Sequence, residues 1–262
     1  MLAGLLSAYL PAGANESADE QGAQGVAVRF MKGSFEHSDQ MWADFPALVP
    51  GVMVVEDVTS EADVRQYTAA FQAAAASRLA VTSEAEFPEV QAWRRAFTQM
   101  GLKPTQYRCA SESLLRRFRN ERDLPPLHPL VDLCNAASIA FGIPVAAFDI
   151  DRITEHLQVR RARGDESFLS FSGESERPET GEVVFVDSAG QAHARRWTHR
   201  QGRASAVGDT TTTALIVTEA LHQNAREDIL SLLQALTVAL TATWRAAPVS
   251  AVLSADAPTF KY

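Results

Sequence analysis

Carboxylates that could take part in acid–base chemistry or bind a cationic group stand at the ends of two short apolar runs. Glu219 ends the run at residues 214–219, and Asp149 and Asp151 follow the run at residues 145–148. A carboxylate at the end of a buried strand can bind a cationic group or orient a water molecule. From the residue pattern alone, a surface position is favoured for Glu219. The two aspartates are compatible with a strand-end pair, although turn capping is favoured.

Two further candidates, Cys134 and Asn135, lie side by side in a predicted helix. A cysteine nucleophile needs an activating base, and no partnered histidine is evident near Cys134, so a small buried residue is favoured there. The histidines lack the spacing of metal ligands, and the glycines form no phosphate-binding loop. We therefore predict neither a metal site nor a cofactor.

The composition is typical of a globular protein, because the 262 residues are 46% hydrophobic and 21% charged. Cys109 and Cys134 lack the spacing of a disulfide scaffold, which favours a cytoplasmic location. No apolar run reaches the roughly 18 residues that a membrane helix needs, so no membrane partner is predicted.

The two ends of the chain differ from its middle. Residues 1–29 join a short apolar start to a stretch rich in Ala, Gly, Gln and Glu, so we predict a disordered N-terminal tail. Residues 248–262 are interpreted as a C-terminal tail. Residues 30–247 contain no linker or repeat and are predicted to form one domain.

Strands and helices alternate irregularly within this domain, which predicts an α+β fold with sheets packed against helices rather than a doubly wound sheet. Helices are expected from apolar periodicity, capping and helix-ending residues at about 60–79, 88–100, 111–120, 130–141 and 226–244. Short apolar runs predict strands at about 51–55, 145–148, 158–161, 182–186 and 214–219.

Charge restricts the choice of partner. The net charge of −8 argues against broad nonspecific binding to nucleic acid, so DNA is not expected as a partner. Arginines nevertheless cluster at 94–122, 160–163 and 195–203. Solvated helix faces with salt bridges explain such clusters, and so does a local basic rim that seats the end of an RNA.

Several motifs occur in a specific order. The segment VDLCNA at 131–136 precedes GIPVAAFD at 142–149, and ALIVTEA follows at 214–220. Their order resembles the B3/B4 editing domain in the beta subunit of bacterial phenylalanyl-tRNA synthetase. The approach segment 111–126 and the residues around Arg196, Trp197, Arg200 and Gln201 are more similar to free-standing B3/B4 proteins. The resemblance covers roughly residues 31–245.

This resemblance implies a deacylase that hydrolyses the ester of a mischarged tRNA in trans, with the tRNA acceptor end as its partner. Cys134 replaces a threonine of the family pattern, and Ala146 replaces a histidine that helps to recognise a tyrosine side chain. Losing that hydrogen-bonding group argues against a tyrosine ester as the substrate. A carboxylate at Glu219 would instead suit an arginine-like or nonprotein basic amino acid.

The resulting expectations for the site fall into three groups. The catalytic residues are Glu219 and Asn135, of which Asn135 shapes the pocket wall. The predicted pocket residues are Cys134, Ala146, Asp149, His199, Arg200 and Gln201. The predicted tRNA contacts are Arg116, Arg117, Arg196, Trp197 and Arg203, although a core position is favoured for the tryptophan.

Two other functions fit the same sequence. One is a noncatalytic module that binds tRNA or a free amino acid, and the other is a scaffold that mediates protein contacts. An open pocket lined by Glu219 and Asn135 favours the enzyme, whereas a pocket filled by side chains favours the scaffold.

Overall fold

Two long apolar strands form the centre of the molecule. In the computed structural model, which describes residues 33–262, β2 (Val49–Val55) and β10 (Ala214–Ala220) pair antiparallel along their length. β11 (Val249–Val252) and β3 (Val145–Asp149) complete a sheet in the order β11-β2-β10-β3. Because other layers cover both faces of this sheet, its central strands are apolar at nearly every position.

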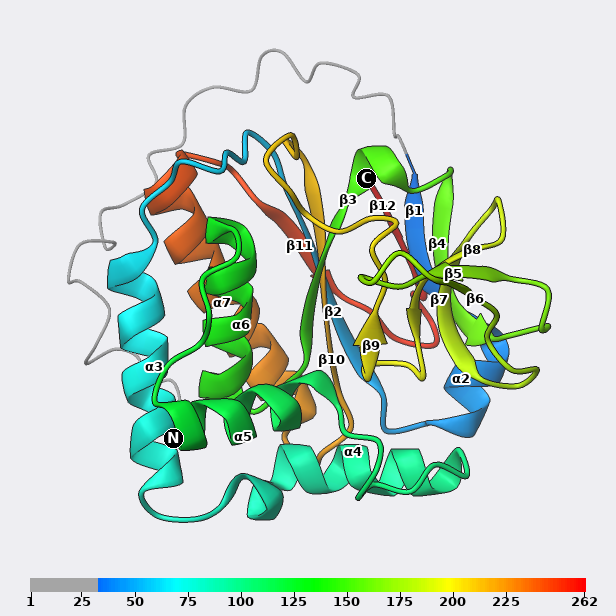
Figure 1. Cartoon of the computed structure of the whole chain (residues 1–262), viewed down its shortest axis with the longest axis horizontal. Coiled ribbons are helices and arrows are strands. Elements are labelled where there is room, and N and C mark those ends of the chain that lie inside the picture. The colour runs from blue at the N-terminus through cyan, green and yellow to red at the C-terminus, as the bar shows by residue number, and fades with distance from the viewer. Residues whose placement is uncertain (1–32) are drawn as a thin grey trace.

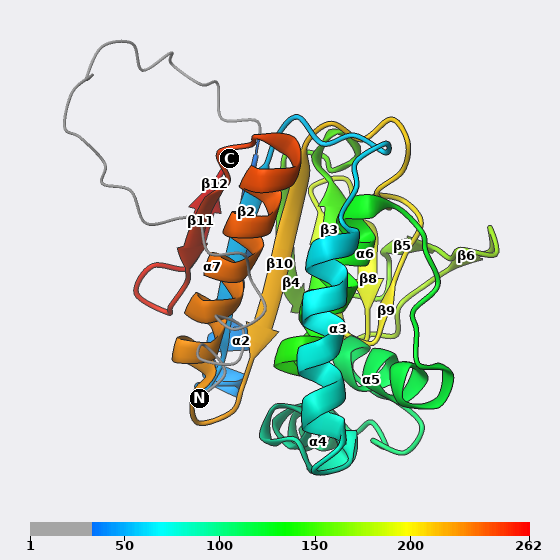
Figure 2. The same cartoon turned by 90° about the vertical axis from the view of Figure 1, so that its left-hand side faces the viewer.

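Helices cover one face of the four-stranded sheet (Figure 1). The three packed there are α3 (Arg65–Leu79), α6 (Pro129–Phe141) and α7 (Ala225–Trp244). Two more lie across the end of the molecule drawn lowest in Figure 1, α4 (Pro88–Gln99) and α5 (Ala110–Glu121). Figure 2 shows α3 and α7 beside the sheet from the helical side. The short helices are α2 (Asp39–Asp44), η1 (Glu84–Glu86) and η2 (Ile150–Arg152).

An eight-stranded sheet covers the other face. Its order is β12-β1-β4-β7-β8-β5-β6, with β9 paired to β8. Its strands are β1 (Ser34–His37), β4 (His156–Arg161), β5 (Ser167–Leu169), β6 (Ser175–Glu176), β7 (Val183–Asp187), β8 (Gln191–Arg195), β9 (Arg200–Gln201) and β12 (Thr259–Lys261). The structure therefore has three layers: helices, four-stranded sheet and eight-stranded sheet.

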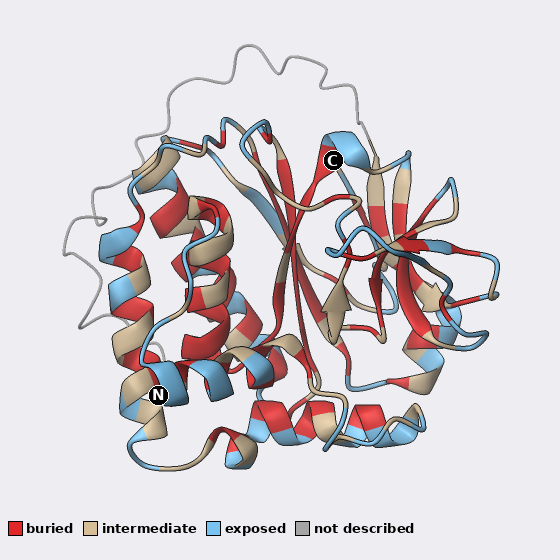
Figure 3. Ribbon diagram, viewed as in Figure 1, coloured by how far each residue is buried: buried red, intermediate tan, exposed pale blue. Residues whose placement is uncertain are grey.

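The core divides along the central sheet because successive side chains of a strand point to opposite faces. Met53 and Ile216 pack against the helices, whereas Val52 and Val217 pack against the second sheet. Figure 3 shows this burial along the central strands and the inner helices. Glu219 lies two residues after Val217 on β10, so both side chains point to the same face, between the two sheets.

The predicted α+β fold is confirmed, and the expected helices and strands occur close to their predicted positions, except that the first long helix begins at Arg65 rather than near residue 60 and has no side-chain cap. The expectation of a loose tail at 248–262 is wrong. β11 pairs with β2 and β12 pairs with β1, so this segment supplies an edge strand to each sheet. Residues 1–29, for which a disordered tail was predicted, lie outside the described residues. No helix among residues 33–262 is long and apolar enough to cross a membrane.

Close packing of α7 on β2 depends on Gly51. A Cβ at this position would lie 2.7 Å from Cγ2 of Ile229 and 2.9 Å from Cγ2 of Thr218. We expect Gly51→Ala to lower the free energy of unfolding by about 1–3 kcal/mol through overpacking, as measured by urea denaturation. Gly208→Ala is the matched control, because no atom lies within 4 Å of its added Cβ. Equal midpoints for the two variants would contradict the prediction.

Candidate functional site

Glu219 lies between the two sheets and is held from one side only. Nε2 of His37 lies 2.6 Å from Oε1, and the indole Nε1 of Trp197 donates a hydrogen bond to the same oxygen at 2.9 Å. Within residues 33–262, Oε2 has no hydrogen-bond partner. The carboxylate is 2% exposed yet lines a cavity, so a ligand there would meet an oriented acceptor.

Trp197 reaches Glu219 from a turn between β8 and β9. Arg196 and Trp197 both have positive φ values, of 49° and 58°, which turn the indole inward. The ring is fully buried and packs edge-on against Phe45 and Trp93. The predicted contact of Trp197 with tRNA is therefore wrong, because its side chain is completely buried. The alternative of a core tryptophan is confirmed.

His37 is a site residue that the sequence analysis missed. It lies on β1, 182 positions before Glu219 in the sequence. Nδ1 of this buried ring has no partner among the described residues. No local motif surrounds it, and only the alternating burial of β1 relates it to the core.

The cavity beside Glu219 has a volume of about 70 Å³. Its walls are mostly apolar and include Pro144, Phe148, Phe185 and Val217. Ala146 lines it as predicted. Because one water needs about 10–15 Å³ of such volume, the cavity holds roughly five to seven water-sized groups. A slender side chain with a polar end fits this space.

His199 lines the same cavity and has a defined tautomer. Its Nδ1 lies 2.7 Å from the carbonyl oxygen of Arg108, which can only accept, so Nδ1 carries the proton. Burial, with smaller effects from the charges of Arg196 and Arg200, lowers the pKa of His199 below its usual 6.5. The neutral ring therefore presents the lone pair of Nε2, and this atom can accept a proton.

A second cavity, of about 300 Å³, contains Asn135 and Cys134 instead of Glu219. β3 separates the two spaces, and only Val145 and Gln201 line both. Burial raises the pKa of the Cys134 thiol to about 12. This cysteine is therefore the small buried residue that was favoured, and not a thiolate nucleophile.

Two predicted pocket residues line neither cavity. Asp149 is buried and accepts hydrogen bonds from the hydroxyl of Thr211 and the backbone N–H of Asp151. Its expected role as a turn cap is confirmed, whereas its place in the pocket is wrong. Arg200 forms an ion pair with Glu176 and lies over the ring of Phe168, so its place in the pocket is also wrong.

The predicted RNA-contacting arginines fall into two groups. Arg116 and Arg203 are exposed, and neither side chain has a partner among residues 33–262. Arg117 pairs with Glu121, and Arg196 lies over the ring of Tyr107 with Glu182 4.0 Å away. The 195–203 cluster is thus partly neutralised by acidic residues of the same sheet.

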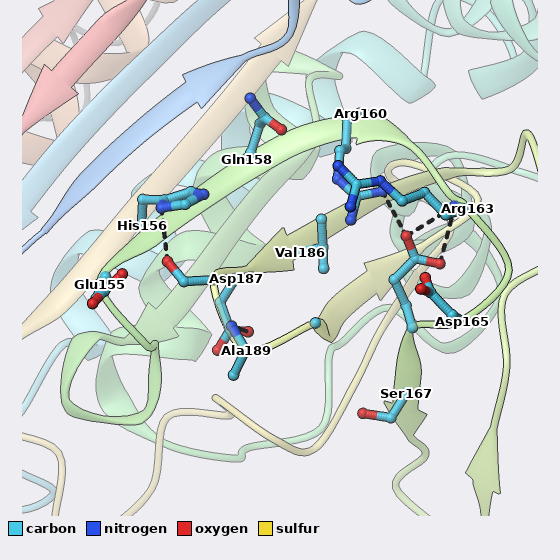
Figure 4. Close-up of a pocket in the computed structure, with 13 residues that line it drawn as sticks. Glu155, His156, Gln158, Arg160, Arg163, Asp165, Ser167, Val186, Asp187 and Ala189 are labelled. Atoms are coloured by element: carbon cyan, nitrogen blue, oxygen red, sulfur yellow. Dashed lines mark hydrogen bonds and ion pairs between the residues drawn. The ribbon is translucent and has the colours of Figure 1, made fainter.

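A larger polar pocket, of about 510 Å³, lies on the second sheet (Figure 4). Arg160 pairs with Glu166, and the Glu166 carboxylate also accepts from the backbone N–H of Arg163. His156 hydrogen-bonds to Ser188. Arg160 and Glu166 thus satisfy each other, and the other lining groups carry both signs of charge, so the pocket indicates no particular ligand.

One group of potential metal ligands occurs among the described residues. Glu89, His222 and Asp228 bring one ligand atom each within 4.8 Å of the others. Glu89 is already paired with Arg78, and His222 with Asp228. A cation would have to displace both pairs, and Arg78 would repel it, so this group gives no support for a metal site.

Comparisons with known proteins agree on one family. The family model described as the B3/4 domain matches residues 92–232, which is more than half of the chain. The match contains β3, β10, α6 and the cavity residues from 110 to 219.

Two curated relatives are phenylalanine–tRNA ligase beta subunits. The protein from Photorhabdus laumondii is 27% identical over 109 residues, covering 40% of this chain and 14% of the relative. The protein from Cereibacter sphaeroides is 32% identical over 66 residues, covering 25% of this chain and 8% of the relative. The chain thus matches a small part of each relative's length.

One solved structure aligns weakly with this chain. An N-terminal fragment of the phenylalanyl-tRNA synthetase beta subunit from Pyrococcus horikoshii aligns with a TM-score of 0.43 and 9% identity. The alignment covers 83% of this chain and 53% of the fragment.

Proposed function

Because this chain belongs to the B3/4 domain family, we propose that it is an aminoacyl-tRNA deacylase that acts in trans on a mischarged tRNA. The curated relatives are tRNA ligase subunits, which supports a tRNA as the partner. The substrate would be met in the cytoplasm, where charged tRNA is used.

One observation carries this proposal: an apolar cavity with a single oriented carboxylate, Glu219, at its wall. A binding pocket of this kind, mostly apolar with few convergent polar groups, is typical of small-molecule sites. It is too small for a nucleobase and ribose but accommodates an amino-acid side chain. Glu219 and Asn135 line separate cavities among the described residues, but the space beside Glu219 is not filled by side chains, which argues against a purely scaffolding role.

The carboxylate favours a cationic side chain. Oε1 of Glu219 is occupied by His37 and Trp197, which leaves Oε2 for the ligand. A guanidinium or ammonium group at the end of an aliphatic chain would bury its stem among Pro144 and Val217 and pair with Oε2. Arginine, lysine and nonprotein analogues of arginine form this substrate class.

Hydrolysis requires a water molecule and a base beside the ester. In our proposal, Nε2 of neutral His199 takes a proton from water while the water oxygen bonds to the ester carbonyl carbon. The tetrahedral intermediate then loses the ribose oxygen, which takes the proton back from His199. The products are the free amino acid and a tRNA with its terminal hydroxyl restored.

The RNA would approach from the side of β3, which is an edge strand of the four-stranded sheet. Gln201 donates a hydrogen bond to the backbone oxygen of Ala147 on this edge. Arg203 lies two residues away with an unpaired guanidinium, and Arg116 offers another on α5. Such local positive charge can hold a few phosphates although the protein is acidic overall.

The test is deacylation of a panel of charged tRNAs by the full-length chain. The panel contains esters of arginine, lysine, an arginine analogue, phenylalanine, tyrosine and alanine, with Glu219→Ala as the control. We expect rapid loss of a basic ester with wild type alone. Tight tRNA binding without hydrolysis of any ester would replace this proposal with a noncatalytic binding module.

A further inference from the structure

The second cavity has the properties of a site for a flat, largely apolar ligand. Its walls include Val131, Ala147 and Val207, and its volume of about 300 Å³ far exceeds that of the cavity beside Glu219. Two large apolar side chains at this cavity are open to solvent: Leu127 is 69% exposed and Phe171 is 63% exposed. Exposed apolar side chains that gather at one cavity are typical of a ligand-binding groove.

Polar groups without partners occur in the same cavity. The side-chain amide of half-buried Asn135 has no hydrogen-bond partner within residues 33–262. His128 is 5% exposed, and its Nδ1 accepts from the backbone N–H of Leu130. The proton of the neutral ring is therefore on Nε2, which is buried and has no partner in the same part of the chain. Both residues can donate hydrogen bonds to a ligand.

The two cavities meet at the edge of β3. Val145 and Gln201 line both of them, and β3 runs between α6 and β9 (Figure 1). A ligand that joins a slender side chain to a flat ring through a short linker could therefore occupy both. An amino acid esterified to a terminal adenosine is such a ligand, because only a ribose separates the ester from the base.

We propose that the second cavity binds the purine base at the 3′ end of the tRNA, with Phe171 stacking on the base and Asn135 reading its edge. An asparagine amide matches the donor and acceptor pair of an adenine edge. An aromatic side chain stacks on a base without a charged partner. The exposed carboxylate of Asp209 on the rim disfavours a phosphate in this space. This inference rests on the proposed function, since it assumes a tRNA partner.

An uncharged RNA hairpin ending in CCA tests the site without any hydrolysis. The terminal adenine is replaced with fluorescent 2-aminopurine, and full-length protein is titrated into it. We expect fluorescence quenching by wild type, and binding weaker by about tenfold or more for Phe171→Ala. Phe171→Trp should restore both the fluorescence quenching and the binding affinity. Leu230→Ala is the matched control, because Leu230 is also an exposed apolar side chain but lies on α7.

A second experiment tests whether Asn135 recognises the hydrogen-bonding edge of the terminal adenine. Hairpins ending in A, G, C or U are compared by competition, and Asn135→Ala is expected to lose the preference for A. If the protein quenches the 2-aminopurine hairpin but hydrolyses no ester in the panel of charged tRNAs, the base site is supported and the deacylase proposal fails. If wild type does not quench the 2-aminopurine hairpin, and Phe171→Ala hydrolyses the tRNA ester with the KM of wild type, the base site is refuted. The deacylase proposal would be unaffected by that result.

Discussion

Glu219→Gln is expected to lower kcat/KM for esters of cationic amino acids by about 100-fold or more, while esters of neutral amino acids change within a few-fold. Removing one partner of a buried ion pair typically costs about 3–5 kcal/mol, and about 1.4 kcal/mol corresponds to each factor of ten. The neutral amide cannot compensate a buried cation. The measurement is single-turnover deacylation of the arginine, lysine and alanine esters.

The glutamine variant is chosen because it should keep the architecture. Its side-chain oxygen can still accept from the indole of Trp197, so the packing between the sheets is retained. Glu166→Gln is the matched control, since it removes a buried carboxylate that pairs with Arg160 on the second sheet. An unchanged ratio of basic to neutral ester rates in Glu219→Gln would refute charge recognition, even if both rates fell.

Much of the central sheet could be predicted from the sequence. β2 and β10 are apolar along nearly their whole length, and this pattern identifies strands that are buried on both faces. Gly142 ends α6 in a left-handed conformation, as its position between an apolar helix and Pro144 indicates. Glu219 was identified through the resemblance of the segment at 214–220 to a family strand that ends in a glutamate, because its place at the end of an apolar run would by itself have favoured the surface.

Most of the eight-stranded sheet was missed. β5, β6 and β9 are only two or three residues long, and β8 carries a glutamine, a histidine and an arginine. Such strands have no apolar periodicity, and they are fixed by pairing between distant segments. The contact of His37 with Glu219 is of the same kind, because nothing near either residue encodes it.

The residues predicted to form one pocket lie in two cavities, because successive side chains of a strand point to opposite faces. Ala146 and Ala147 point to opposite faces of β3, so the cavity beside Glu219 and the cavity beside Asn135 lie on different sides. The same alternation separates Arg200 from Gln201 on β9. A motif that is continuous in sequence therefore supplies two neighbouring spaces, which is the arrangement that a substrate with two distinct ends requires.

His199→Gln is expected to lower kcat by about 10²–10⁴-fold with little change in KM, since general-base catalysis contributes a factor of this size. The pH profile separates a base from a structural residue. Only the neutral ring can take a proton, so wild-type kcat/KM should rise with pH and level off below pH 6.5, because the pKa of His199 is lowered. This rise of kcat/KM with pH, the acid limb of the profile, should be absent in His199→Gln.

His156→Gln provides the control for this experiment, because His156 is a half-buried histidine paired with Ser188 in the polar pocket of the second sheet. His156→Gln should keep the wild-type kcat and the rise of kcat/KM with pH below 6.5. Ionisation of the substrate's own amino group affects all three proteins equally, so any limb that it causes persists in His199→Gln. If the limb below pH 6.5 survives in His199→Gln together with the wild-type kcat, His199 is not the base and the attacking water is activated by another group at the ester.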